Sequence, residues 1–201
     1  MELSHGKFRF QVPDSVYPPA EDSFMLADSA ASLRGKILEV GCGSGIASIA
    51  CAAADKGNEV VGVDINPDAV ECAAQNAELN KIPNARFLVG DLFGPIEDER
   101  FDAIIFNPPY LPTADYERFE GDINRAYDGG KDGRETIDRF LSEFDSRLIP
   151  GGTLLLIQSS LNDLEKTKRA LASIGYRISI EKEQSFFFEK LFLIKAAKPQ
   201  V

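Results

Sequence analysis

Short apolar runs alternate along the chain with stretches whose apolar residues recur at helical spacing. The runs that we expect to form strands are residues 36–40, 59–63, 86–89, 101–106 and 153–158. Between the first two, small apolar residues share one helical face: Ile46, Ile49, Ala50 and Ala53. Strands that alternate with helices in this way predict an α/β fold with a doubly wound, mostly parallel sheet.

The two ends of the chain depart from this alternation. Residues 1–18 are polar, mixed and proline-bearing, and we expect an extended arm or a short hairpin there. A helix should start within residues 19–23, where acidic side chains suit the positive first turn. Residues 176–180 and 187–194 are β runs with no helix between them, so they should pair antiparallel.

Cap and turn residues set the boundaries of the remaining helices. Asn66 and Pro67 suit the N-cap and first position of a helix that runs to about Asn80. A helical stripe is formed by Ile137, Phe140, Leu141, Phe144 and Leu148. The last expected helix starts at Ser160 and stops at Gly175. Its expected buried side comprises Leu161, Leu164, Leu171 and Ile174.

The pattern shows no repeat and no linker. We therefore expect a single domain over residues 1–201, with an arm and helix over 1–35 and a catalytic core over 36–201. The expected connection over residues 111–132 is long, charged and glycine-rich, and loops of that length are usually functional or mobile.

Composition narrows the classes of function. The chain has 22 Lys and Arg against 32 Asp and Glu, a net charge of −10, which opposes binding to nucleic-acid backbones. It shows no signal peptide and no apolar run of the ~20 residues that span a bilayer, so we expect a cytoplasmic protein without membrane contact. Cys42, Cys51 and Cys72 lack metal-site spacing and should be small buried residues. With His5 as the single histidine, neither a metal site nor histidine-dependent catalysis is expected.

Glycines and polar residues follow the expected strands. Residues 41–45 follow the first strand, Asp64 the second, Asp91 the third and Asn107 the fourth. Ligands of doubly wound sheets sit beyond the carboxyl ends of the strands. These positions therefore predict one site.

The tetrapeptide Asn107-Pro108-Pro109-Tyr110 ends the fourth strand. Proline has no N–H for the sheet, and Pro108 also favours an extended Asn107. The corner offers the Asn107 side-chain oxygen and a carbonyl near Pro108 as acceptors, and the Tyr110 ring for stacking. The corner can bind a planar group with N–H donors, such as an amide NH2 or the amine of a base.

The glycine loop has the pattern Glu39-x-Gly-x-Gly-x-Gly. The dinucleotide-binding fingerprint G-x-G-x-x-G/A requires Gly or Ala at its third conserved position, and this loop lacks a Gly or Ala there. A carboxylate at Glu39 would repel a pyrophosphate and suits a cationic ligand. Asp64 can bind two ribose hydroxyls, while Asp91 and Leu92 can offer a carboxylate and an apolar lid to adenine. A cofactor with adenosine, a positive centre and no phosphate is S-adenosylmethionine.

Several motifs together resemble a class I methyltransferase: residues 39–45, 64–67, 91–92 and 107–110. Within that class the chain resembles the HemK-type protein glutamine methyltransferases, which methylate the Gly-Gly-Gln glutamine of peptide-chain release factors. Residues 17–23 and 126–135, the latter leading to Asp138-Arg139-Phe140, resemble the short archaeal and eukaryotic branch. The resemblance implies a Rossmann-like seven-stranded sheet, mostly parallel with a C-terminal antiparallel strand.

The resemblance also implies roles for individual residues. The expected cofactor-binding residues are Ser23, Glu39, Gly41, Gly43, Gly45, Asp64, Ile65, Asp91, Leu92 and Asn107. The expected catalytic residues are Asn107, Pro108, Pro109 and Tyr110. With about 35 residues before the first strand, we expect no counterpart of the helical substrate domain of bacterial relatives. The short branch works with a small zinc-binding activator, a candidate partner beside the release factor.

Alternative functions stay open at this point. An amino methyltransferase acting on adenine or guanine in DNA or RNA uses a similar tetrapeptide, but residues 111–135 hold seven acids and four bases. Lysine methylation is a further alternative, although the corner suits a planar amide better. A dinucleotide-dependent oxidoreductase is disfavoured by the glycine spacing, and a non-catalytic cofactor-binding scaffold by the intact corner.

Overall fold

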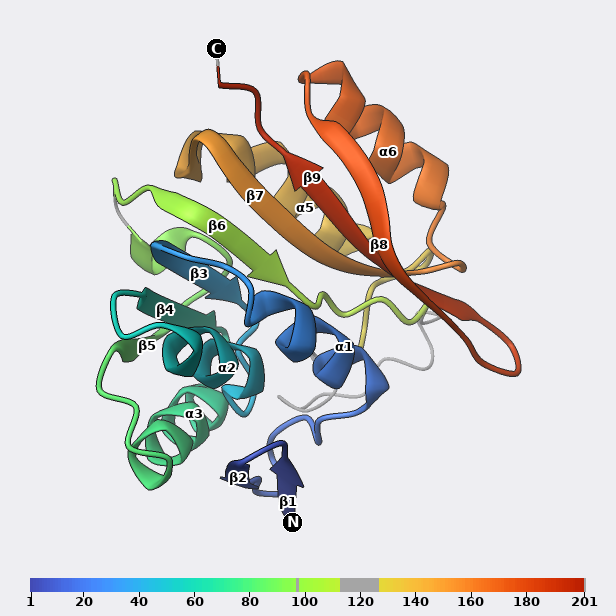
Figure 1. Cartoon of the computed structure of the whole chain (residues 1–201). Helices are drawn as coiled ribbons and strands as arrows, with labels where there is room; N and C mark the ends of the chain where they lie inside the picture. The colour runs from blue at the N-terminus through green and yellow to red at the C-terminus, as the bar shows by residue number, and fades with distance from the viewer. Residues whose placement is uncertain (97, 113–126, 201) are drawn as a thin grey trace.

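The computed structural model describes residues 1–96, 98–112 and 127–200. Within them, a seven-stranded sheet has the order β5-β4-β3-β6-β7-β9-β8 (Figure 1). Its strands are β3 (Lys36–Val40), β4 (Glu59–Asp64), β5 (Ala85–Val89), β6 (Phe101–Phe106), β7 (Leu148–Ser159), β8 (Arg177–Ser185) and β9 (Lys190–Ala197). The strands from β5 to β7 pair in parallel, and β9 runs antiparallel to both β7 and β8. The expected fold class is confirmed.

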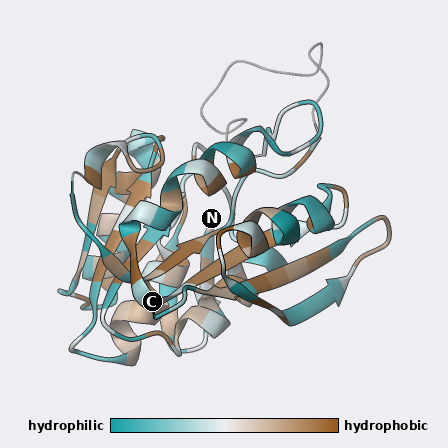
Figure 2. Ribbon diagram, turned by 90° about the horizontal axis from the view of Figure 1, so that it is seen from above, coloured by the Kyte–Doolittle hydropathy of each residue, from teal (hydrophilic) through white to brown (hydrophobic). Residues whose placement is uncertain are grey.

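Helices cover both faces of the sheet. One face packs against α1 (Glu21–Ala30), α2 (Ile46–Ala54) and α3 (Pro67–Leu79), and the other against α5 (Glu135–Glu143) and α6 (Leu164–Ser173). Short 3₁₀ turns are η1 (Gly94–Ile96) and η3 (Phe144–Arg147). Alternate strand residues enter opposite cores: Ile37 faces the first three helices, and Leu38 faces the other layer. Figure 2 shows hydrophobic residues concentrated along the strands, between helices that carry hydrophilic residues.

The order of the sheet explains why β3 and β6 are mostly apolar. Both are central strands with covered faces, and β6 buries five of its six residues. Their carboxyl ends meet at one edge, because β3 and β6 pair in parallel from Ile37 opposite Ala103 to Val40 opposite Phe106. This pairing places the glycine loop beside Asn107.

The N-terminal arm is a hairpin of β1 (Glu2–His5) and β2 (Phe8–Gln11). It docks on α3, where the Asn76 side chain accepts from the Gln11 N–H at 2.8 Å and the Asn80 side chain accepts from the Arg9 N–H at 3.0 Å. This confirms the expectation of a hairpin. It also gives the chain a fixed route into α1.

Leu148 was predicted to end the helical stripe, and that prediction is wrong. The helix α5 ends at Glu143, η3 follows, and Leu148 is extended at φ −99° and ψ 130°, where it begins β7. Pro150 disfavours a helical Ile149, and Gly151 at φ +77° accommodates an irregularity in the pairing with β6. Residues 150–152 therefore lie inside β7, which begins five residues before the expected strand over residues 153–158.

The predicted start of the last helix is also wrong. The N-cap is Asp163, whose side chain accepts from the Lys166 N–H at 2.9 Å, and the Ser160 hydroxyl instead accepts from the Lys190 N–H. Leu161 and Ile174 are 49% and 46% exposed rather than buried. Ser160 thus binds β9, a strand distant in sequence, instead of capping the helix as the local sequence predicted.

At the C-terminal hairpin the predicted strand over residues 187–194 begins too early. Phe187 and Phe188 lie between β8 and β9, at the protruding end of that hairpin, and are 92% and 86% exposed (Figure 1). Their β propensity is overridden because the strands turn there.

The sequence also led to expectations for the three cysteines and for membrane-spanning segments. Cys42, Cys51 and Cys72 are free and buried, as predicted. Over the parts of the chain that the structure describes, no helix combines the length and apolarity needed to cross a bilayer.

Candidate active site

A cavity of about 650 Å³ opens beyond the carboxyl ends of β3, β4 and β6. Most of the residues proposed from sequence line it: Ser23, Glu39, Gly41, Gly43, Asp64, Ile65, Asp91, Leu92, Asn107, Pro108, Pro109 and Tyr110. Gly45 does not line it. That glycine is the N-cap of α2, and a Cβ there would lie 3.0 Å from the Cβ of Ala73. Its small size lets α2 approach α3.

The glycine loop between β3 and α2 forms one wall of the cavity. Gly43 has φ +51°, and a Cβ built there would meet no protein atom within 4 Å. The Gly43 N–H donates to Asp64 Oδ2 at 2.8 Å, and the Cys42 N–H donates to the Val63 carbonyl at 3.0 Å. The loop is therefore fixed to the end of β4 and leaves open space above its backbone.

Glu39 lies at the base of the cavity and is 4% exposed. The Ser48 N–H donates to Glu39 Oε2 at 2.7 Å, and the Ser48 hydroxyl donates to the same oxygen. The pKa of Glu39 is raised to about 8: burial is the largest cause, the charge of Asp64 adds to the rise, and the two Ser48 hydrogen bonds oppose it. The carboxyl is thus poised between its neutral and charged forms near neutral pH.

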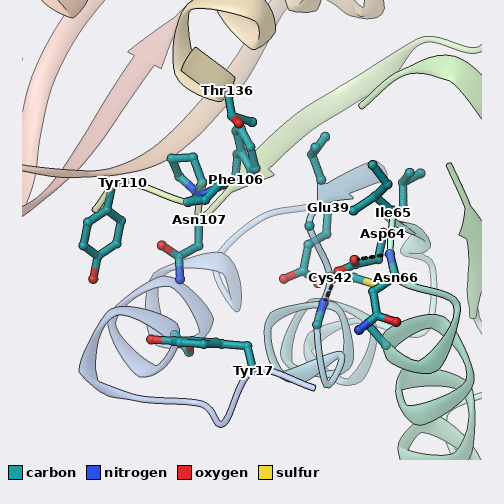
Figure 3. A pocket seen from close by; sticks show the side chains of 18 of the residues that line it. Tyr17, Glu39, Cys42, Asp64, Ile65, Asn66, Phe106, Asn107, Tyr110 and Thr136 are labelled. Atoms are coloured by element: carbon teal, nitrogen blue, oxygen red, sulfur yellow. Dashed lines mark hydrogen bonds between the residues drawn. The ribbon is translucent and has the colours of Figure 1, made fainter. Parts of the chain in front are cut away.

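Asp64 ends β4 and holds two adjoining segments. Its carboxylate accepts from the Gly43 N–H and, at 2.9 Å, from the Asn66 N–H at the start of α3 (Figure 3). Burial raises the pKa of Asp64, and the N–H groups of Asn66, Gly43 and Ile65 partly offset that rise. A carboxylate can accept about four hydrogen bonds, so acceptor capacity remains for hydroxyl groups in the cavity.

Asp91 and Ile65 also line the cavity. Asp91 Oδ2 accepts from Arg139 of α5 at 2.5 Å, and both side chains are about half exposed. Ile65 is 44% exposed although it is apolar, and Leu92 beside Asp91 is buried. An apolar wall next to a carboxylate suits a flat heterocycle with an amine. The pairing of Arg139 with Asp91 was not predicted from the sequence.

The Asn107 corner forms the opposite wall. The Asn107 Nδ2 donates to Asp22 Oδ2 at 3.0 Å, and the Tyr110 hydroxyl donates to the same oxygen at 3.2 Å. The Asn107 Oδ1 is buried and has no hydrogen-bond partner among the residues that the structure describes. The Tyr110 carbonyl accepts from Asn162 Nδ2 at 2.7 Å, which holds the corner from behind. Figure 3 shows Asn107, Tyr110 and Tyr17 around the same space.

Asp22 and Tyr17 were missed as site residues by the sequence reasoning, which used Asp22 only as a helix-start acid. Asp22 is 3% exposed and accepts from the Tyr17 hydroxyl at 3.1 Å. Burial and the nearby Asp22 carboxylate raise the pKa of both Tyr17 and Tyr110, so these phenols remain hydrogen-bond donors. The signal for Asp22 was present in the motif of residues 17–23, which places an acid where a helix turns inward.

The predicted connection over residues 111–132 is described only at its ends, since residues 113–126 lie outside the described residues. The Leu111 N–H donates to the Tyr127 carbonyl at 3.1 Å, and the Gly129 N–H donates to the Leu111 carbonyl at 3.0 Å. The Tyr127 ring meets the Tyr17 ring edge-on at 5.1 Å. Both ends of the connection therefore close on the cavity.

Known proteins provide an independent comparison. The family model of the methyltransferase small domain matches residues 22–119. The putative protein N5-glutamine methyltransferase of Methanocaldococcus jannaschii is 43% identical over 190 residues, which cover 94% of each chain. The methyltransferase HEMK2 of Homo sapiens is 34% identical over 205 residues, covering 96% of this chain and 95% of the human protein.

Solved structures agree with the sequence comparisons. The E. cuniculi Mtq2-Trm112 complex, responsible for methylation of the translation termination factor eRF1, contains a similar chain. It matches with a TM-score of 0.70 and 28% sequence identity, over 92% of this chain and 99% of that one.

Proposed function

Because this chain belongs to the family of protein N5-glutamine methyltransferases, we propose that it methylates the Gly-Gly-Gln glutamine of a peptide-chain release factor with S-adenosylmethionine. The observation that carries the proposal is the buried Asn107 Oδ1 beside the cavity, an acceptor to which none of the described residues donates. Such an atom suits a ligand that brings N–H groups, as a glutamine amide does.

The residues around the cavity fit the proposed cofactor. The open space at Gly43 leaves room for a ligand against the backbone, Glu39 offers a carboxyl to an ammonium group, and Asp64 has acceptor capacity for ribose hydroxyls. Ile65 and Asp91 would receive the adenine ring and its amine. Ser23 lines the cavity from α1 and would approach the methionine portion.

When bound, S-adenosylmethionine would supply an electrophilic methyl group on a positively charged sulfur, and the acceptor amide would give up one N–H proton to water in exchange for that methyl group. The chain's own residues orient the acceptor. Asn107 Oδ1 and the Pro108 carbonyl would accept from the NH2 group, and Tyr110 would stack on the amide plane. Pro109 keeps the corner rigid. Orientation of this kind can contribute ~7–11 kcal/mol to lowering the barrier.

A transfer assay with labelled cofactor tests this function against its alternatives. We expect label in a release factor from the same source and none in a variant whose Gly-Gly-Gln glutamine is alanine. Transfer to duplex DNA or to RNA in place of the release factor would favour the amino methyltransferase of bases. Transfer that survives the glutamine replacement would instead favour lysine or another residue.

Cofactor affinity should depend on pH through Glu39. The folded pKa lies near 8, above the ordinary 4.5, so the carboxyl is mostly protonated at pH 6 and must lose its proton to receive a cation. Affinity for S-adenosylmethionine should therefore rise by up to about tenfold per pH unit between pH 6 and 8. The neighbouring Cys42 and Cys51 thiols, whose pKa values burial raises, stay neutral in this range.

Calorimetry at pH 6, 7 and 8 checks this dependence. Replacing Glu39 by glutamine should flatten the profile, and a flat profile in the unmodified protein would contradict the assignment. Without ligand, the same raised pKa stabilises the fold below pH 4.5, and this contribution is lost as the pH rises through 8.

We further propose that a small zinc-binding activator adds a strand to β5. Of the described strands, only β4 pairs with β5, so β5 is an edge strand of the described sheet. The Asn84 carbonyl and the Gly90 N–H both bond to β4, and alternation then turns the N–H groups of Phe87 and Val89 outward. Val89 is 51% exposed, and an open edge with apolar side chains favours strand addition.

Replacing Val89 by proline should remove one outward donor and weaken partner binding, while the bonds to β4 stay intact. Co-purification with the activator and stimulation of methyl transfer are the measurements, and the Val89→Ala variant is the control for loss of the side chain. Full activity of the purified chain alone, unchanged by either substitution, would contradict an activator at this edge.

A further inference from the structure

We propose that Asp22 is a positioning residue, which holds the Asn107 side chain with its oxygen turned toward the methyl acceptor. The inference rests on the proposed function, because it concerns the orientation of an amide acceptor in the same site. It assigns a role in transfer to a carboxylate of α1 that would touch neither the methyl group nor the reacting nitrogen.

The first step is the contact that fixes the Asn107 amide. Asp22 Oδ2 lies 3.0 Å from Asn107 Nδ2, across 85 positions of sequence. A carboxylate can only accept hydrogen bonds, so its neighbour must be the NH2 end of the amide. The contact thereby settles which end of the Asn107 side chain points where, a choice that geometry alone leaves open.

The second step concerns the other end of the amide. With Nδ2 engaged, Oδ1 faces away from Asp22; it is buried and accepts no hydrogen bond within the described part of the chain. Buried acceptors normally find donors, so an open one beside a cavity indicates that a ligand supplies the donor. If Asn107 were to rotate by half a turn, it would offer N–H groups to the acceptor's N–H groups, and binding would fail.

The third step is the rigidity of Asp22 itself. Its carboxylate is 3% exposed and accepts from the Tyr17 hydroxyl at 3.1 Å, the Tyr110 hydroxyl at 3.2 Å and the Ser23 N–H at 2.6 Å. These donors come from the segment before α1, from the corner and from α1. The carboxylate is therefore held in one place, as a positioning group must be.

The negative charge also favours the transition state. The Asp22 carboxylate polarises the Asn107 amide and increases the negative charge on Oδ1. The acceptor nitrogen gains positive charge as the N–C bond forms, so its hydrogen bond to Oδ1 strengthens during transfer. An interaction that strengthens in this way raises kcat rather than only lowering KM.

The test compares Asp22→Asn with the matched control Asp28→Asn, an exposed carboxylate on the same helix. Asparagine has the same shape but can donate, so it no longer fixes the direction of the Asn107 amide. We expect Asp22→Asn to lower kcat on the release factor by about 100-fold. The S-adenosylmethionine dissociation constant and Tm should stay near those of the unmodified chain, and Asp28→Asn should leave kcat unchanged.

A double variant separates positioning from a structural role. If Asp22 acts through Asn107, the Asp22→Asn, Asn107→Ala double variant should transfer methyl no more slowly than Asn107→Ala alone. Activity of Asp22→Asn within threefold of the unmodified chain would overturn the proposal, and so would an equally large further loss on the Asn107→Ala background.

A spectroscopic measurement on the unmodified chain covers the case in which Asp22→Asn does not fold. Asparagine-selective ¹⁵N labelling, with Asn107→Ala for assignment, should show Asn107 side-chain N–H protons protected from exchange with water. Rapid exchange would overturn the proposal. This measurement needs no substrate, so it decides on Asp22 even if the release factor proves not to be the acceptor.

Discussion

Replacing Asn107 by alanine is expected to lower methyl transfer by about 1,000-fold while the fold and most of the cofactor affinity remain. The side chain lies at the end of β6, where it is only half-buried, and its oxygen has no described protein partner to lose. Its removal takes away the acceptor for the substrate NH2, and losing one oriented group of this kind costs 100- to 1,000-fold in rate.

Single-turnover rates and calorimetry of the Asn107→Ala variant check this expectation. Asn80→Ala is a suitable control, because Asn80 binds the N-terminal hairpin at the far end of α3 and does not line the cavity. Near-normal turnover of Asn107→Ala on a substrate that the unmodified chain methylates would contradict the assignment of the acceptor site.

The second large effect is expected for Asp64→Ala, which should weaken S-adenosylmethionine binding by roughly 100-fold or more. Hydrogen bonds to a charged group contribute about 1.5–3 kcal/mol each, and the hydrogen bonds from two ribose hydroxyls to Asp64 would be lost. The substitution also frees the Gly43 N–H, which Asp64 holds at 2.8 Å, so the glycine loop loses its anchor on β4.

Titration calorimetry measures the loss, and Asp68→Ala makes the same change of charge on the exposed start of α3. Asp68→Ala should bind the cofactor as the unmodified chain does. An unchanged dissociation constant in Asp64→Ala would withdraw the ribose-binding role.

The sequence was sufficient to predict secondary structure wherever the local pattern of apolar residues agrees with the fold. Strand β3 begins and ends at the predicted residues, Lys36 and Val40, because its apolar run is bounded by Gly35 and Gly41. The parallel order then brings Asp64 and Asn107 to one edge of the sheet, as the rule for doubly wound folds predicts. For that reason the sequence could predict that these side chains line one cavity.

The errors arose where a distant contact decides the local structure. Ser160 bonds to the backbone of β9 rather than capping a helix, and Phe187 sits in a turn whose place depends on the pairing of β8 with β9. Asp22 and Arg139 contact Asn107 and Asp91 only after α1 and α5 dock on opposite sides of the sheet. Charge and spacing along the chain do not encode such pairings.

Tandem mass spectrometry of the release factor tests the proposed function most directly, after incubation with this chain, the proposed activator and S-adenosylmethionine. We expect one added methyl group on the side-chain nitrogen of the Gly-Gly-Gln glutamine, absent when Asn107→Ala replaces the unmodified chain. An unmodified glutamine, or a methyl group on another residue, under conditions where the chain consumes the cofactor would contradict it.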